Sequence, residues 1–266
     1  GDYARAEDAG TRAVANDPRD AWAIHAVAHV LEMTNRVVDG QQWLASRTGD
    51  WSEDNFFAVH NWWHLALFYL DQQRWDEVLT LYDTRIRGTD SAVIMDMLDA
   101  SALLWRLQLH GVDVGDRWQR LVAVWEPHIE DAWYSFNDNH AMMSFVGAGR
   151  SDLAARLLAV MDRSARQATD NGMMTRTVGL PFANALVAYA DGRYAEAVDL
   201  LTPVKAIAAR AGGSHAQRDV LAQTLTSAAE KAGRRSLARS LLNERLALKP
   251  CSGLNVAWMQ RVTAAN

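Results

Sequence analysis

The fold is decided by one stretch of the chain, His60-Asn61-Trp62-Trp63-His64-Leu65-Ala66-Leu67-Phe68-Tyr69. Apolar side chains recur in it at steps of three and four residues, the spacing that places them on one face of a helix. The members of that face are Trp62, Leu65, Ala66 and Tyr69. His60 and His64 are interleaved with them and lie four residues apart, so they share another face of the same helix. The stretch predicts a packed helix that also carries a pair of histidines.

The apolar spacing resembles the W-x₂-L-G-x₂-Y pattern of a tetratricopeptide repeat, with Ala66 in the glycine position. A weaker repetition is a five-residue step from glycine to alanine, found at Gly149/Ala154, Gly192/Ala197 and Gly233/Ala238. No strand pattern interrupts the helical ones. We therefore expect an all-α fold, a right-handed superhelical stack of antiparallel helical hairpins of the tetratricopeptide-like solenoid type, with about six hairpins of roughly 34 to 45 residues.

Helical spacing, capping residues and turn residues place the expected helices along the chain. They cover 21–35, 37–47, 56–70, 75–82, 91–110, 118–125, 136–146, 151–165, 180–190, 194–201, 214–231 and 235–248. Asp20 is the expected cap of the first of these helices, and Gly40 is expected where two helices pack closely. Asn171-Gly172 is predicted to be a loop, and Pro250 is predicted to end the last helix.

Residues 1–266 are expected to form a single repeat domain whose first hairpin is incomplete. The chain begins with Gly1 rather than Met, and its first residues look like the second helix of a hairpin. The residues that give this impression are Tyr3, Ala6, Ala13 and Pro18. A stack cut at this point would expose the apolar face that an upstream repeat covers. We expect either preceding repeats in a longer chain or association into a homo-oligomer.

Composition excludes several classes of partner. The 27 Lys and Arg residues against 32 Asp and Glu residues give a formal charge of −5, without a basic stripe suited to phosphates, so nucleic acid is not an expected partner. No apolar run approaches the roughly 20 residues of a membrane-spanning helix, so no membrane association is expected. The single cysteine, Cys251, and an N-terminus without signal-peptide features favour a cytoplasmic location.

Five polar blocks together resemble the tetratricopeptide repeat protein 38 family over nearly the whole chain. They are His25-Ala26-Val27-Ala28-His29-Val30-Leu31-Glu32-Met33, His60-Asn61-Trp62-Trp63-His64, Asp99-Ala100-Ser101-Ala102-Leu103-Leu104-Trp105-Arg106-Leu107, Asn137-Asp138-Asn139-His140-Ala141-Met142 and Gly212-Gly213-Ser214-His215-Ala216-Gln217-Arg218-Asp219. The blocks are not part of the general repeat consensus. The family is longer at its N-terminus, which puts the completeness of a pocket wall there in doubt. The resemblance implies the fold, and it carries no established activity.

Most histidines fall on the helices expected to be first in their hairpins, which line the concave surface of such stacks. These six of the eight histidines are His25, His29, His60, His64, His140 and His215. The other polar residues predicted to bind a ligand from the same helices are Glu32, Asp99, Arg106, Asn137, Asp138 and Arg218. This distribution predicts one polar concave pocket.

A divalent metal is the cofactor that the pattern allows. His25, His29 and Glu32 share one helix face, and two histidines four residues apart can chelate an ion through their imidazole nitrogens. A second pair, His60 and His64, can complete the site. The alternative is that each histidine is a satisfied polar group inside a Trp-rich stack. The pattern lacks both the zincin H-E-x-x-H motif and the E-x-x-H pair of di-iron bundles.

A second interpretation is a small polar or anionic ligand held by Arg106 and Arg218, with a histidine as general base. The candidate catalytic residues are His60, His64, His140 and His215. The sequence leaves open whether the protein is an enzyme. The alternative from another class is a scaffold that binds a peptide or partner helix in the concave groove. Trp62 is predicted to be core, and Trp63 to contact a neighbouring hairpin rather than to form a ligand wall.

Overall fold

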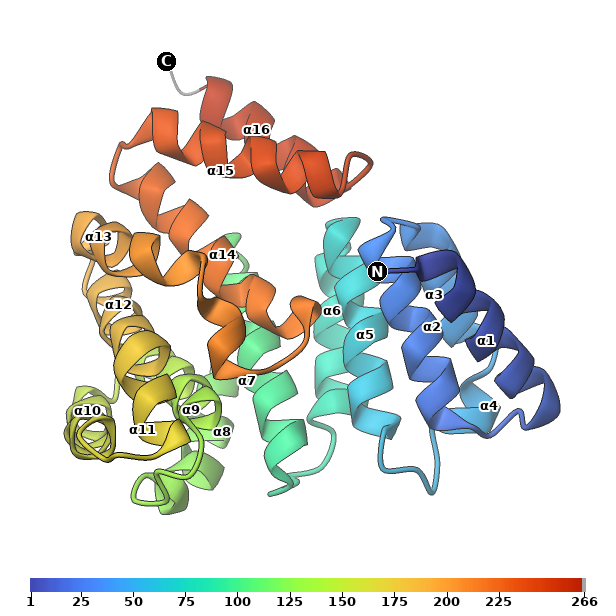
Figure 1. Cartoon of the computed structure of the whole chain (residues 1–266), viewed down its shortest axis with the longest axis horizontal. Coiled ribbons are helices and arrows are strands. Elements are labelled where there is room, and N and C mark those ends of the chain that lie inside the picture. The colour runs from blue at the N-terminus through green and yellow to red at the C-terminus, as the bar shows by residue number, and fades with distance from the viewer. Residues whose placement is uncertain (265–266) are drawn as a thin grey trace. The chain divides into compact units, whose positions relative to one another are not determined.

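The computed structural model describes residues 1–264, and every regular element in that range is a helix. The all-α prediction is confirmed, while the superhelical arrangement stays a prediction. The chain forms two compact units, the first made of Gly1–Thr89 together with Arg239–Asn266 and the second of Asp90–Ala238 (Figure 1). Within the described range, no helix is both long and apolar enough to span a membrane.

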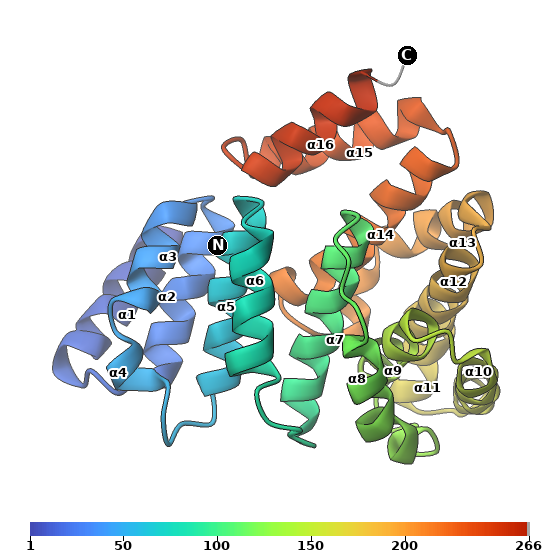
Figure 2. The ribbon, with the colours of Figure 1, turned by 180° about the vertical axis from the view of Figure 1, so that it is seen from behind.

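The first unit begins with a run of consecutive helices. They are α1 (Tyr3–Asn16), α2 (Ala21–Met33), α3 (Val37–Ala45), α4 (Thr48–Trp51), α5 (Ala58–Asp71), α6 (Trp75–Leu81) and the π-helical turn η1 (Tyr82–Ile86). Each long helix packs on the next, and α2 also contacts α5, beside which it lies in Figures 1 and 2. Asp20 caps α2 as expected, because its carboxylate accepts a hydrogen bond of 2.9 Å from the Ala23 N–H.

The close contact expected at Gly40 is present between α3 and α5. A Cβ atom built on Gly40 would lie 2.1 Å from Cζ of Phe68, so only glycine lets the ring sit against α3. Tryptophans fill the neighbouring core: Trp51 is fully buried, and its ring contacts Trp62 in a T-shaped pair with centroids 4.6 Å apart. Trp62 is therefore a core residue, as predicted.

The end of the chain completes the first unit. Helix α15 (Arg235–Leu248) enters it, and α16 (Gly253–Ala264) packs on α5. The Cys251 N–H donates to the side-chain oxygen of Asn35 at 2.7 Å, and the Ser252 hydroxyl donates to Asp71. The sequence prediction ended the helices at Pro250 and missed α16, whose mixed composition gives it little amphipathic character.

The second unit contains the remaining helices. They are α7 (Ile94–Leu109), α8 (Arg117–Trp125), the 3₁₀ turn η2 (Glu126–His128), α9 (Ser135–Gly147), α10 (Ser151–Ala165), α11 (Asp170–Met174), the π-helical turn η3 (Thr175–Gly179), α12 (Leu180–Ala190), α13 (Tyr194–Lys205), the 3₁₀ turn η4 (Ala208–Ala211) and α14 (His215–Lys231). The loop predicted at Asn171-Gly172 is instead helical, because Thr169 caps α11 through a 3.0 Å bond from the Gly172 N–H.

One contact in the second unit joins helices far apart in sequence. Helix α14 packs on α7, and the Trp105 indole N–H donates to Thr224 Oγ1 at 3.0 Å. In a linear stack each repeat contacts only its neighbours, so this contact is additional to the repeat pattern. This contact lies within the second unit, and the single repeat domain expected over 1–266 stays a prediction.

Candidate metal centre

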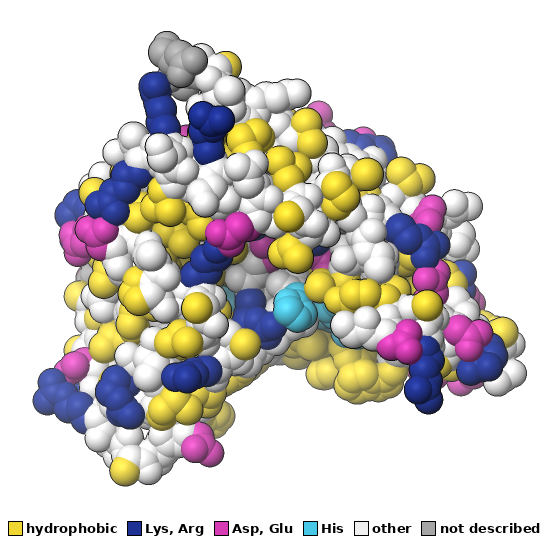
Figure 3. Space-filling model, turned by 45° about the horizontal axis from the view of Figure 1, so that its top comes forward, with side chains coloured by type: hydrophobic (Ala, Val, Ile, Leu, Met, Phe, Trp, Pro, Cys, Tyr) yellow, Lys and Arg dark blue, Asp and Glu magenta, His cyan; other side chains and the backbone are white. Residues whose placement is uncertain are grey.

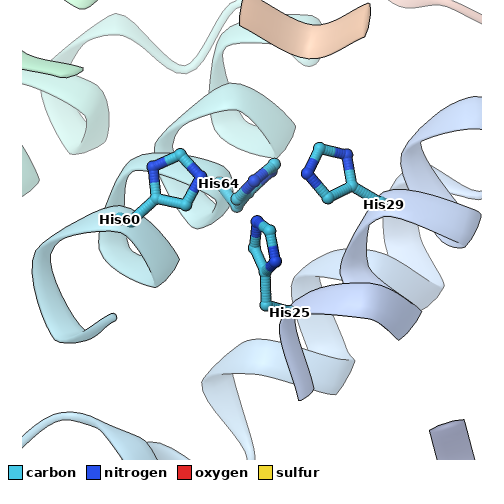
Figure 4. A group of neighbouring side chains, drawn as sticks. All are labelled: His25, His29, His60 and His64. Carbon is cyan, nitrogen blue, oxygen red and sulfur yellow. The ribbon is translucent and has the colours of Figure 1, made fainter. Parts of the chain in front are cut away.

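Two neighbouring helices of the first unit bring four histidines together. His25 and His29 lie four residues apart on α2, and His60 and His64 lie four residues apart on α5. One ligand nitrogen from each ring can be chosen so that all four lie within 4.8 Å of one another. Figure 4 shows the two pairs facing each other across the space between the helices. The predicted metal-ligand set is thus one spatial cluster.

The rings are packed tightly enough to act on one another. The ring centroids of His29 and His64 are 4.4 Å apart, and those of His25 and His29 are 4.5 Å apart. His60 and His64 are buried, whereas His25 and His29 are half-buried. On the face drawn in Figure 3, histidine side chains are visible beside hydrophobic ones. The half-burial of the α2 pair gives an ion a way in from solvent.

Aromatic side chains form the walls of the cluster. The Trp63 ring is fully buried and stacks on His60, with centroids 5.2 Å apart and an interplanar angle of 14°. Phe57 stacks on His25 at 4.9 Å and also meets Trp22 edge-on at 4.2 Å. An apolar surround lowers the local dielectric and strengthens a metal–nitrogen bond. Trp63 therefore supports the histidines within its own unit.

The sequence prediction missed Phe57, which contacts two histidines of this site, and Trp22, which packs on Phe57. A usable signal was present for Phe57, because it lies three residues before His60. Residues three apart on a helix are neighbours on its surface. An aromatic residue in that position therefore has a high chance of contacting the imidazole.

Burial and crowding keep His25 neutral. Burial, together with the charges of His29 and His60, lowers its pKa to about 3. Its Nε2 atom is buried and has no hydrogen-bond partner among residues 1–264. A neutral imidazole with an unused nitrogen is the form that coordinates a metal.

Glu32, the seventh residue after His25 on α2, was predicted to bind the same ligand. Its Oε1 atom accepts from the ammonium group of Lys249, and its Oε2 atom is buried without a hydrogen-bond partner among residues 1–264. The four-histidine group does not include this carboxylate. Glu32 shares the helix face of His25 and His29, so it places negative charge on the side where a cation would sit.

The remaining predicted site residues belong to the second unit and are held by different partners. Arg106 donates from Nη1 to the Ala102 carbonyl at 3.0 Å and from Nη2 to the Ala216 carbonyl at 2.7 Å. Its guanidinium therefore joins α7 to the start of α14. Arg218 donates to the carbonyl oxygens of Gly212 and Gly213. Both arginines are committed to backbone oxygens, which weakens the expectation that they hold an anionic ligand.

Two pockets of the second unit are lined by other predicted residues. His140 and Arg218 line one with an empty volume of about 330 Å³. His140 is neutral there, because burial lowers its pKa to about 4. Its Nδ1–H donates to the Phe136 carbonyl at 2.7 Å. Asn137 and Asp138 line the other pocket. Asp99 is buried on α7, and His215 is exposed at the start of α14.

No family model matches the chain. The features that mark the cluster as a candidate metal site are geometric: four imidazole nitrogens from two adjacent helices lie close together, and aromatic rings surround them. Imidazole is a ligand for zinc, copper, iron and nickel, and is less suited to magnesium and calcium. The arrangement is able to hold a transition-metal ion.

Proposed function

We propose that the first unit binds one divalent transition-metal ion through His25, His29, His60 and His64. The observation that carries this proposal is the approach of four ligand nitrogens to within 4.8 Å of one another, from two neighbouring helices. Four clustered histidines without a shared ligand would repel one another on protonation. A metal ion replaces those protons by one charge that all four rings bind.

Zinc is the ion that fits best. Its bonds to histidine nitrogen of 2.0–2.1 Å place two ligands of a tetrahedron about 3.3 Å apart. The largest separation within the cluster is 4.8 Å, so side-chain rotations of modest size bring the nitrogens into range. Four neutral imidazoles leave the charge of the ion uncompensated, and the carboxylate on the same face of α2, that of Glu32, is paired with Lys249 but keeps its Oε2 atom without a hydrogen-bond partner among residues 1–264.

The ion has a structural role in this proposal. Four protein ligands fill a tetrahedral site, whereas catalytic zinc sites keep one position for water or substrate. The four ligands come from α2 and α5, so the ion cross-links the two helices. Packing of the consecutive pairs α2–α3 and α5–α6 in the first unit, and α9–α10 and α12–α13 in the second, supports a helical-repeat scaffold for the chain.

Metal analysis of the protein, purified without a histidine tag, tests the proposal. We expect about one equivalent of zinc per chain by plasma mass spectrometry, because the ligand set is complete. The double variant His60→Ala/His64→Ala should contain almost none. The control is His110→Ala/His215→Ala, which removes two histidines of the second unit and should keep the wild-type metal content. Equal content in all three proteins would refute the site.

Loss of metal through unfolding must be separated from loss of ligands. Circular dichroism shows whether the double variant is still helical. Cobalt(II) added to the metal-free protein gives a second readout, since tetrahedral nitrogen coordination produces intense visible bands. A folded double variant without these bands supports the proposal. The same bands in wild type and variant would place the cobalt elsewhere.

A further inference from the structure

A second pocket lies within the second unit, where the chain passes from α8 into α9. Its empty volume is about 430 Å³, part of which is open to solvent. Trp125 at the end of α8, the turn η2 and the first residues of α9 contribute to it. It shares no residue with the histidine cluster, so its function is independent of the proposed metal site.

Asp138 is the polar group of this pocket that lacks a partner. It lies in the first turns of α9, is only 6% exposed, and its Oδ2 atom has no hydrogen-bond partner among residues 1–264. Burial, together with the negative charge of Asp131, raises its pKa to about 7. A buried carboxylate opposed by a second carboxylate is costly unless a cation or a proton compensates it.

Asp131 already has a hydrogen-bond partner, so Asp138 is the carboxylate of the pocket that is left to bind a cation. The His128 Nδ1–H donates to Asp131 Oδ2 at 2.7 Å, and the two side chains are about equally exposed. His128 in turn contacts the Trp125 ring at a centroid distance of 6.4 Å. The pocket thus has one carboxylate with a hydrogen-bond partner, Asp131, and one buried carboxylate, Asp138, whose Oδ2 atom has none among residues 1–264.

Aromatic rings surround these carboxylates. Trp125 is buried at 1% exposure, whereas Trp133 is 80% exposed, the largest exposed fraction among the large hydrophobic side chains described. Tyr134 lies beside them and stacks on Phe136 at 5.6 Å. Indole and phenol faces attract cations, most strongly organic ammonium ions whose hydration is weak. The exposed Trp133 offers an aromatic face to such an ion, and the Asp138 carboxylate offers it a negative charge.

We propose that this pocket binds a small organic ammonium ion, with Asp138 as its counter-ion and Trp125, Trp133 and Tyr134 as its aromatic walls. The carboxylate supplies charge and the rings supply apolar contact and cation–π attraction. An inorganic cation would use the carboxylate alone, since it holds its hydration shell more strongly than an alkylammonium ion.

Titration with trimethylammonium chloride, followed through the indole N–H signals in a nitrogen–proton correlation spectrum, tests this proposal on the whole chain. We expect saturable shifts of the Trp125 and Trp133 signals. The neutral analogue of similar shape, tert-butanol, should produce none, and neither should sodium chloride at the same ionic strength. Absence of saturable shifts, or equal shifts with tert-butanol, would overturn the proposal.

Two variants assign the roles of the residues. Asp138→Asn keeps the shape and removes the charge, and should weaken trimethylammonium binding by about tenfold or more, as expected for loss of a charged partner. Trp133→Ala should weaken it as well. The control is Asp152→Asn, an exposed carboxylate on α10 that pairs with Arg150, and it should bind as the wild type does.

The variants also separate an ammonium site from a site for inorganic cations. If calcium or sodium binds with saturation and depends on Asp138 but not on Trp133, the ammonium proposal is wrong. A well-dispersed spectrum of Asp138→Asn shows that the variant is folded. Undiminished binding by that folded variant would also refute the proposal.

Discussion

The surroundings of His25 in the cluster oppose its protonation. Burial, together with the neighbouring rings of His29 and His60, lowers its pKa from 6.5 to about 3. The unfolded chain takes up a proton at this residue near the usual histidine pKa of 6.5, while the folded chain does not. The folded state therefore binds fewer protons between these two pKa values, and its stability falls as the pH is lowered through that window. His140 acts in the same direction, since its pKa falls to about 4.

We expect the variant His25→Gln to reduce this pH dependence. In metal-free protein with a chelator, lowering the pH from about 7 to about 5 should destabilise the wild type by about 1 to 2 kcal/mol more than the variant. The measurement is urea denaturation at both pH values. His140 is unchanged in both proteins, so its contribution cancels in the difference, which reports His25 and its interactions with His29 and His60. Equal losses in the two proteins would show that His25 is not held neutral.

The shifted pKa of Asp138 changes the stability with pH in the opposite direction to that of His25. Its pKa is raised to about 7, so the folded state keeps a proton that the unfolded state releases above its usual pKa near 3.8. Its contribution to stability is complete below that lower value and is lost as the pH rises toward 7. The two residues titrate in opposite directions because one is a base and the other an acid, although burial is the larger cause for both.

At the scale of elements, helix packing places the histidine pairs. Helix α3 packs against α5 at Gly40, where the Phe68 ring occupies the space of a side chain. Helix α5 carries His60 and His64 on another part of its surface and is also in contact with α2. The approach of the two pairs therefore depends on how α5 is seated among its neighbours.

Gly40→Ala should disturb this seating. The added methyl group would overlap the Phe68 ring and should cost roughly 1–3 kcal/mol of unfolding free energy, the usual range for overpacking. Denaturant unfolding gives the number. The matched control is Gly49→Ala in α4, where a Cβ atom meets nothing within 4 Å. If both variants lose the same stability, steric overlap with Phe68 is not the cause.

At the scale of the whole molecule, the chain is divided into two units, and each has its own candidate site. The histidine cluster lies within the first unit, and the aromatic pocket with Asp138 lies within the second. The first unit is discontinuous, because α16 and the end of α15 join helices from the beginning of the chain. The ion pair between Lys249 and Glu32 joins the end of the chain to α2 within this unit.

Removal of metal should therefore act on one unit only. A ligand at 100 times its dissociation constant stabilises the folded state by about 2.7 kcal/mol. We expect a chelator to accelerate amide hydrogen exchange in α2 and α5 and to leave α9 and α14 unchanged, as measured by mass spectrometry. The His60→Ala/His64→Ala variant should show no response to the chelator. A uniform response across both units would contradict a local cross-link.

The sequence by itself determined most of the helices and the two histidine pairs, because helical spacing, caps and four-residue steps are local properties that a helix converts directly into shared faces. It also supported a metal site from those pairs. Only the tertiary structure brought α2 and α5 together, placed Phe57 against His25, and joined α16 to α5. Contacts between distant segments leave no periodic signal in the chain. For the same reason, only the packing around α9 showed that the Asp138 Oδ2 atom is buried without a hydrogen-bond partner among residues 1–264.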